Sequence, residues 1–175
     1  MDQLGRPSVE KFRTQPKLPV TLVLDNVRSM HNVGSAFRTS DAFAVEQIIL
    51  CGITGTPPHR EIEKTALGAT KSVVWHYESQ TISAIQRLRG QGYRIIAIEQ
   101  AKDSTQLQQF IPADNEKYAL VFGNEVHGVS DEVMESVDAC IEIPQSGTKH
   151  SLNVAVSIGI VLWSVYAKCY LPAKG

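Results

Sequence analysis

The C-terminal part of the chain places the strongest restriction on how it can fold. Residues 152–166 show a helical pattern that is apolar on nearly every side. Such a helix must be covered on more than one side, unlike a helix on the surface of a small domain. A short apolar strand at residues 139–143 precedes it, followed by Pro144, which cannot continue a ladder, and a polar turn around Gly147. We expect a strand, a turn, and a buried helix capped at Ser151.

Short apolar runs alternate with helical patterns along the rest of the chain. Runs rich in Val, Ile and Leu are typical of strands that are buried on both sides. Their alternation with helices predicts an α/β domain with a mostly parallel sheet and helices on both faces. We expect six strands, at residues 20–24, 47–51, 73–75, 93–98, 118–122 and 139–143, and helices at residues 8–14, 32–43, 61–67, 81–89 and 152–166.

Composition narrows the class of protein. A chain of 175 residues, of which 43% are hydrophobic, has the size and core of one domain, so residues 1–175 are taken as a single domain in which residues 1–19 lead into the first strand. The net charge of -1 argues against a histone-like polycation, although residues 1–40 hold six Lys and Arg against three Asp and Glu. The three cysteines and five histidines show no metal-ligand spacing, so we expect no metal. We recognise no apolar signal region and no membrane span, and we expect a cytoplasmic protein.

Three polar clusters follow the carboxyl ends of predicted strands, at residues 26–38, 123–128 and 145–153. The carboxyl ends of parallel strands share one edge of a sheet, which is where ligands bind in open α/β proteins. Glycine-rich phosphate loops of the Gly-x-Gly-x-x-Gly and Gly-Lys-Ser/Thr types are absent, as is the Gly-x-Ser-x-Gly of many hydrolases. The sequence therefore predicts a polar site that is formed by three loops and is not a common nucleotide site.

Each cluster also has a purely structural interpretation. Arg38 is an ordinary surface cation unless a phosphate or ribose lies beside it. Glu125 is an exposed acid in a glycine-rich turn unless it orients a neighbouring group. Asn153 is an additional helix cap or a buried hydrogen-bond partner unless it contacts a ligand. Taken one at a time, the clusters do not decide between these alternatives.

Together, the three clusters resemble the three motifs of the SpoU-TrmH family of RNA ribose methyltransferases, within the SPOUT superfamily. Order and spacing agree over roughly residues 20–168, which is nearly the whole chain. In one departure, many members carry Asn-Pro where this chain has Ser29-Met30. The matching residues are Asn32-x-Gly34-x-x-x-Arg38-Thr39, Gly123-x-Glu125-x-x-Gly128, and Ile143-Pro144-Gln145-x-Gly147 with Ser151-Leu152-Asn153-Val154.

The resemblance implies a fold, a cofactor and a reaction. Members of this family have a deep trefoil knot, expected here within residues 118–170, bind S-adenosylmethionine in the knot loops, and form homodimers through the C-terminal helix. The implied reaction is methylation of a ribose 2′-hydroxyl in RNA, with tRNA as the first expected substrate and rRNA as the second. By motif position, the cofactor would contact Ile98, Gly123, Ile143, Gln145 and Leu152, and the catalytic set would be Arg38, Asn32, Glu125, Ser151 and Asn153.

Within that set, the resemblance implies that Arg38 assists removal of the hydroxyl proton, with an RNA phosphate as its partner. It also implies that Arg38 reaches the site formed by the other subunit of the dimer. A guanidinium is too basic to act as an ordinary base, so its role as proton acceptor is left open. A non-catalytic knotted dimer that binds RNA or cofactor is the alternative from another class, and the presence of the whole catalytic set argues against it. A base methyltransferase of the same superfamily is disfavoured, because the matched motifs are those of the ribose branch.

Overall fold

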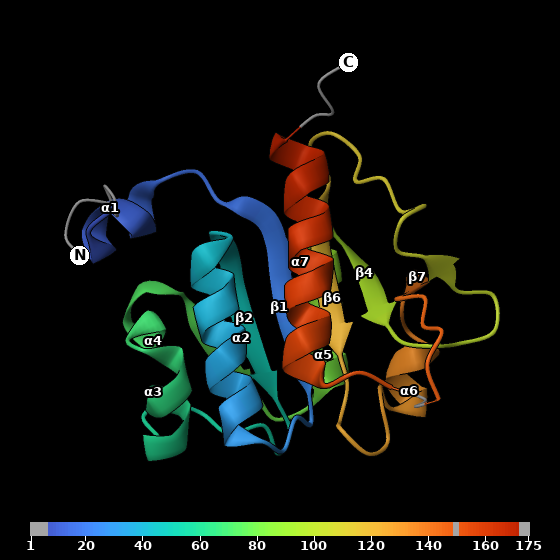
Figure 1. Cartoon of the computed structure of the whole chain (residues 1–175), viewed down its shortest axis with the longest axis horizontal. Helices are drawn as coiled ribbons and strands as arrows, with labels where there is room; N and C mark the ends of the chain where they lie inside the picture. The colour runs from blue at the N-terminus through green and yellow to red at the C-terminus, as the bar shows by residue number, and fades with distance from the viewer. Residues whose placement is uncertain (1–6, 149–150, 172–175) are drawn as a thin grey trace.

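Seven parallel strands form the middle layer of the computed structural model, which describes residues 7–148 and 151–171 (Figure 1). The strands are arranged in the order β3-β2-β1-β6-β4-β7-β5, and each neighbouring pair is parallel. The strands are β1 (Leu18–Asp25), β2 (Val45–Cys51), β3 (Trp75–Glu78), β4 (Tyr93–Ile98), β5 (Thr105–Gln106), β6 (Lys117–Phe122) and β7 (Ala139–Glu142).

Helices cover both faces of this sheet, as expected for alternating strands and helices. The two faces bury separate hydrophobic clusters. One face carries α1 (Val9–Thr14), α2 (Met30–Ala42), α3 (Arg60–Ala66), α4 (Ala69–Ser72) and α7 (Val154–Tyr170), and the other carries α5 (Thr81–Gly90) and α6 (Asp131–Met134).

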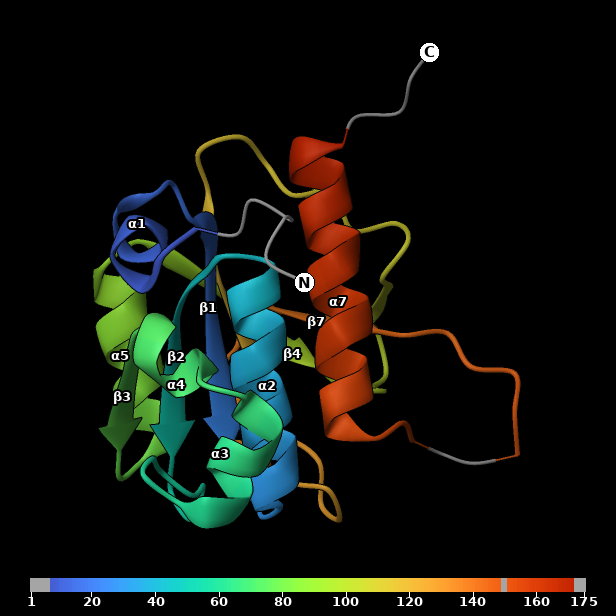
Figure 2. The same cartoon turned by 60° about the vertical axis from the view of Figure 1, so that its left-hand side comes forward.

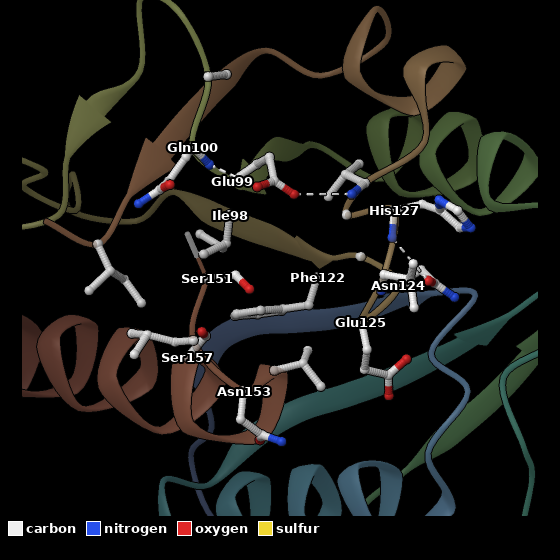
Figure 3. Close-up of a pocket in the computed structure, with 18 of the residues that line it drawn as sticks. Ile98, Glu99, Gln100, Phe122, Asn124, Glu125, His127, Ser151, Asn153 and Ser157 are labelled. Atoms are coloured by element: carbon white, nitrogen blue, oxygen red, sulfur yellow. Dashed lines mark hydrogen bonds between the residues drawn. The ribbon is translucent and has the colours of Figure 1, made fainter. Parts of the chain in front are cut away.

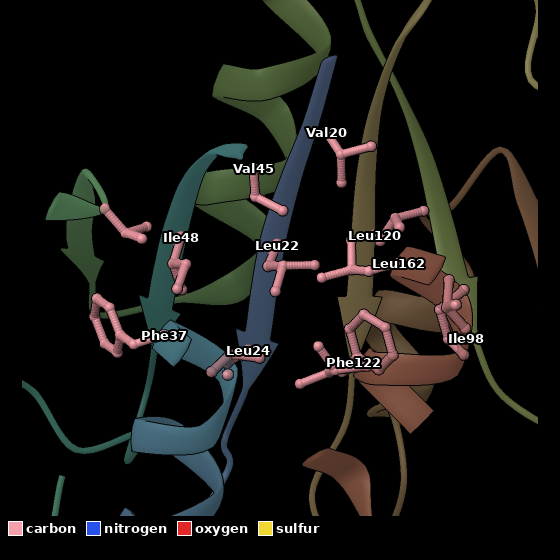
Figure 4. Packing of buried hydrophobic residues seen from close by; sticks show 14 of the residues in the cluster. Val20, Leu22, Leu24, Phe37, Val45, Ile48, Ile98, Leu120, Phe122 and Leu162 are labelled. Atoms are coloured by element: carbon pink, nitrogen blue, oxygen red, sulfur yellow. The ribbon is translucent and has the colours of Figure 1, made fainter. Parts of the chain in front are cut away.

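The interior strand β1 shows why its sequence is mostly apolar, without alternation between apolar and polar residues. Leu22 and Leu24 belong to the hydrophobic cluster that also contains Phe37 of α2 and Leu162 of α7 (Figure 4). Val23, between them, belongs to the cluster on the opposite face. All three strand residues are fully buried, because successive side chains of a strand point to opposite faces and both faces are covered.

The sheet differs from the expected one in its two edges. Seven strands are present instead of six, because the two-residue strand β5 pairs with β7 and is too short and too exposed to produce a sequence pattern. The third strand runs from Trp75 to Glu78, not over residues 73–75. The backbone N–H of Val73 instead donates to the carbonyl of Ala69 and ends the single-turn helix α4. The sequence predicted neither α4 nor the equally short helix α6.

Helix α7 is buried along one side only, whereas the sequence predicted burial on more than one side. Val154, Ile158, Val161, Leu162 and Val165 face the core. The other side is apolar and exposed, with Val156 50% and Trp163 53% accessible. None of the helices in the described residues is long and apolar enough to cross a membrane.

Helices α2 and α7 lie side by side and run in the same direction (Figures 1 and 2). Strand β7 lies on the outer side of β4, and the chain then returns to α7 on the face that carries α2. Both helices therefore begin near the same edge of the sheet, where β1, β4, β6 and β7 end. This arrangement brings the three polar clusters to one place.

Candidate active site

A cavity of about 810 Å³ lies at the carboxyl ends of β4, β6 and β7 (Figure 3). Its apolar middle includes Ile98 and Phe122, with Glu99 on one side and Glu125 and Asn153 on the other. A cavity of this volume is typical of small-molecule sites. Eight of the residues expected at the site line it, namely Ile98, Gly123, Glu125, Ile143, Gln145, Ser151, Leu152 and Asn153.

A chain of side-chain hydrogen bonds joins the three motifs beside this cavity. The amide nitrogen of Asn32 donates to Oε1 of Glu125 at 2.9 Å. The amide oxygen of Asn32 accepts from Nδ2 of Asn153 at 3.2 Å. One residue from each motif is therefore held by the others, although the three are far apart in the sequence.

Asn153 caps helix α7, and the expectation that Ser151 does so was wrong. The helix begins at Val154, and Oδ1 of Asn153 accepts from the backbone N–H of Ala155 at 2.9 Å and of Val156 at 3.4 Å. The carbonyl end of the amide thus serves the helix, while its NH₂ end reaches Asn32. Ser151 is left with its hydroxyl at the cavity (Figure 3).

Glu125 accepts hydrogen bonds from the start of α2. Oε2 accepts from the backbone N–H of Arg28 at 2.9 Å, and Oε1 accepts from the backbone N–H of Ser29 at 3.0 Å as well as from Asn32. Partial burial alone would raise the pKa of this carboxyl, but the three donors outweigh it and hold the pKa below its ordinary value. Glu125 is therefore ionised near neutral pH and tied to the first motif.

Replacing Glu125 with Gln is expected to destabilise the protein in a pH-dependent way. A carboxyl whose pKa is lowered by folding contributes stability above its ordinary pKa of 4.5, and the contribution is lost as the pH falls through the folded value. The side chain is exposed, so solvent screening limits the effect to about 1 kcal/mol or less.

Denaturant unfolding of both proteins between pH 7 and pH 3 measures this difference, with Glu132→Gln on the surface of α6 as the control for loss of one negative charge. A difference that stays constant down to pH 3 would contradict the ionised role of Glu125.

The glycines of the second motif are required by close backbone packing. The loop closes through paired backbone hydrogen bonds between Asn124 and Gly128 of 2.8 and 2.9 Å. A Cβ on Gly123 would lie 2.1 Å from backbone atoms of Gly128 and Val129. Gly128 itself has φ +69°. The sequence left open whether Glu125 is an exposed acid in a glycine-rich turn or a residue that orients a neighbour, and Glu125 is both exposed and bonded to Asn32.

Arg38 lies apart from the cavity of its own chain. It is exposed on α2, and neither Arg38 nor Asn32 belongs to the described residues that line the cavity. Asn32 still reaches the cavity wall through its bonds to Glu125 and Asn153, whereas the structure does not bring Arg38 to the other expected catalytic residues within one chain.

The departure at Ser29-Met30 leaves the start of α2 intact. Ser29 is the N-cap of this helix, and its hydroxyl oxygen accepts from the backbone N–H of Asn32 at 3.3 Å. Met30 begins the helix and packs against the core beside Gly55. The start of the helix that carries Asn32 is therefore fixed by a serine cap.

Sequence reasoning missed Asp25, which it treated only as the start of a turn. Asp25 is 1% exposed, and its carboxylate accepts from the hydroxyl of Thr81 at 2.6 Å and from the backbone N–H and hydroxyl of Ser130 at 3.1 and 3.0 Å. The end of the second-motif loop is thereby attached to β1. The available signal was an Asp at the end of a mostly apolar strand, because a buried polar group needs hydrogen-bond partners.

The fold and cavity define an α/β protein with a cavity at the carboxyl edge of a parallel sheet, lined by residues that follow β4, β6 and β7. Residues 19–163 match the SpoU rRNA Methylase family, and the chain belongs to this family.

Two relatives and one solved structure illustrate the similarity. The tRNA (guanosine(18)-2'-O)-methyltransferase of Thermus thermophilus is 32% identical over 154 residues, which cover 86% of this chain and 75% of the relative. The 23S rRNA (guanosine-2'-O-)-methyltransferase RlmB of Neisseria meningitidis is 31% identical over 144 residues, covering 82% of this chain and 56% of the relative. The crystal structure of the AdoMet-bound rRNA methyltransferase from Sinorhizobium meliloti has a TM-score of 0.78 and 28% identity, covering 88% of this chain and 59% of that one.

The chain spans less than two thirds of the length of several curated relatives. It covers 63% of a TrmH family tRNA/rRNA methyltransferase of Staphylococcus saprophyticus and 56% of the Neisseria protein.

Proposed function

We propose that the protein transfers a methyl group from S-adenosylmethionine to a ribose 2′-hydroxyl in RNA, with tRNA as the first candidate substrate and rRNA as the second. The observation that carries the proposal is the hydrogen-bond chain from Glu125 through Asn32 to Asn153, which joins the three motifs at the wall of one cavity. Relatives named as tRNA and as 23S rRNA methyltransferases support both substrates.

The lining of the cavity suits S-adenosylmethionine, which carries a sulfonium and an ammonium cation. Three carboxylates line the cavity, from Glu99, Glu125 and Asp131, and no Lys or Arg is present among its described lining residues. A cofactor rich in phosphates would meet repulsion there. When bound, the cofactor would supply an electrophilic methyl group, and the residues proposed to hold it are Ile98, Gly123, Ile143, Gln145 and Leu152.

In this proposal the residues of the chain act mainly by positioning. Ser151 and Asn153 orient the target ribose at the cavity, and Asn32 holds Asn153 in place. Glu125 is a poor candidate for a proton acceptor, since its carboxylate already accepts three hydrogen bonds and its pKa is lowered. Alignment of the hydroxyl with the methyl group is worth up to about 7 to 11 kcal/mol of the barrier.

We further propose a homodimer in which Arg38 serves the cavity of the partner. The exposed side of α7 carries Val156, Ile160 and Trp163, and α2, with Arg38 on its exposed surface, lies beside this helix. Trp163 is in turn part of an aromatic cluster with Phe43, whose ring centroid is 6.2 Å away. Contiguous exposed apolar surface of this kind marks protein interfaces, and a two-fold pairing would bring each Arg38 to the other subunit.

The proposed knot over residues 118–170 has topological support. Strand β7 lies outside β4, yet α7 returns to the side of α2 (Figures 1 and 2). The segment between β7 and α7 shares the cavity wall with the loops that follow β4 and β6. A single domain over residues 1–175, with residues 1–19 leading into the sheet, is proposed together with the knot.

Separate incubations of the purified protein with methyl-labelled S-adenosylmethionine and either tRNA or ribosomal RNA test the reaction, after digestion of each RNA to nucleosides. We expect label in a 2′-O-methyl nucleoside from tRNA, and label from ribosomal RNA alone would exchange the order of the two substrates. Label on a base would contradict ribose transfer. Cofactor binding with no transfer to either RNA would favour the non-catalytic alternative.

A further inference from the structure

Glu99 presents a carboxylate to the cavity that the three motifs do not include. It follows Ile98 at the end of β4 and lines the cavity wall (Figure 3). Its Oε1 accepts from the backbone N–H of Gln100 at 2.9 Å, and its Oε2 accepts from the backbone N–H of Val129 at 3.2 Å. A carboxylate offers about four acceptor positions, so these two bonds fix its orientation and leave acceptor capacity for a ligand.

The second-motif loop leaves room for this carboxylate. Gly128 has φ +69°, and a Cβ at this position would lie 2.3 Å from Oε2 of Glu99. Any side chain at residue 128 would therefore displace either the loop or the carboxylate. The glycine that ends the second motif thus serves the position of Glu99 as well as the turn itself.

Glu99 lies across the cavity from Asn153, one of the two residues that are proposed to hold the target ribose. Glu99 and Gln100 are on one side, Ile98 and Phe122 lie in the middle, and Glu125 and Asn153 are on the opposite side (Figure 3). A ligand whose reacting atom is near Asn153 would present a different, non-reacting part to Glu99. The hydrogen-bond donors of S-adenosylmethionine available for that contact are the 6-amino group of its adenine, its ribose hydroxyls and its ammonium group.

We propose that the carboxylate of Glu99 is a cofactor-binding group that accepts a hydrogen bond from an O–H or N–H donor of S-adenosylmethionine remote from its methyl group. The inference rests on the proposed function for the identity of the cofactor. An interaction made equally before and during methyl transfer affects binding and not the rate of the bound complex. Glu99 therefore acts on cofactor affinity and not on the chemical step.

Glu99→Gln in the full chain tests this by titration calorimetry without RNA. The substitution keeps the size of the side chain and one acceptor oxygen but removes the charge. We expect the Kd for S-adenosylmethionine and for S-adenosylhomocysteine to rise by the same factor, about ten- to a hundredfold for a hydrogen bond to a charged group. Glu132→Gln on α6 removes a carboxylate that does not line the cavity and should leave both Kd values unchanged.

Three truncated ligands separate the donor groups from a purely structural role. 5′-Methylthioadenosine lacks the ammonium group, so an unchanged Kd for it in Glu99→Gln assigns the contact to the ammonium. A raised Kd assigns the contact to the ribose, provided that 5′-methylthio-2′,3′-dideoxyadenosine binds both proteins equally. Weakening of the dideoxy compound but not of its purine analogue without the 6-amino group assigns the contact to the adenine. Equal weakening for every ligand, including that purine analogue, would mean that Glu99 only ties the two loops together and would overturn the proposal.

The turnover of the variant gives an independent check. With saturating S-adenosylmethionine, kcat for methyl transfer should stay within about twofold while KM for the cofactor rises. A lower kcat with an unchanged Kd would place Glu99 in the chemical step and contradict the inference. If wild-type protein binds the cofactor but modifies no RNA, the proposed methyl transfer is wrong. The binding test of Glu99 remains valid in that case.

Discussion

Replacing Arg38 with Ala should lower methyl transfer by at least about a hundredfold while the Kd for S-adenosylmethionine changes little. Loss of a single group that stabilises developing negative charge typically has an effect of this size. Arg38 is exposed and does not line the cavity of its own chain, so its removal leaves the cofactor site intact. Single-turnover transfer to RNA and calorimetry of cofactor binding, both on the same preparation, measure the two quantities.

Mixing of two inactive variants shows which subunit supplies the arginine. Leu152→Arg blocks the cavity without disturbing the core, because Leu152 lines the cavity and is 38% exposed. When the two variants are co-expressed, half of a random set of dimers contains one subunit of each. If Arg38 acts across the interface, each mixed dimer has one complete site, formed by the open cavity of the Arg38→Ala subunit and Arg38 of the Leu152→Arg subunit. About a quarter of wild-type activity is then expected.

Two results would contradict the shared site. Absence of activity in mixed dimers of confirmed composition would place Arg38 in the site of its own chain. A protein that is monomeric by light scattering and fully active would remove the need for a partner altogether.

Replacing Gly123 with Ala is expected to raise the Kd for S-adenosylmethionine by at least about a hundredfold. The added Cβ would lie 2.1 Å from the carbonyl carbon of Gly128 and the nitrogen of Val129, and backbone cannot move aside as a flexible side chain can. The loop must therefore open where Ile98, Glu99 and the second motif form the cavity wall.

Gly90→Ala is the matched control, since no heavy atom lies within 4 Å of the added Cβ. Calorimetry measures the Kd for each protein, and denaturant unfolding shows whether each one is folded. Unchanged affinity in a folded Gly123→Ala protein would mean that this loop does not shape the cofactor site.

Local sequence pattern predicted those parts of the fold that long-range pairing does not decide. The strand around Leu22 was recognisable because a strand covered on both faces must be apolar throughout. β5 was not recognisable, because its two residues belong to the sheet only through pairing with β7. The apolar Val73 and Val74 suggested a strand where Val73 ends a helix, since an apolar pair does not distinguish the two.

The site shows the same limit. The three motifs identified Asn32, Glu125 and Asn153 as a group, but neither their mutual hydrogen bonds nor the capping of α7 by Asn153 follows from spacing. Glu99 carried no signal, because an acid after a strand is ordinary in a turn. The position of its carboxylate depends on the absence of a side chain at Gly128, 29 residues later in the sequence. This contact is evident only in the folded structure.

The common direction of α2 and α7 has an electrostatic consequence. Each helix has a partial positive charge of about half a proton charge at its N-terminus. Both N-termini lie at the side of the cavity formed by Glu125 and Asn153, and Glu125 neutralises the first of them by accepting from Arg28 and Ser29. A hydroxyl that begins to lose its proton near Asn153 would thus meet a field from the protein backbone that favours the oxyanion. Part of the acidity required of the ribose would then come from the direction in which α7 points, and no side chain would have to act as a strong base.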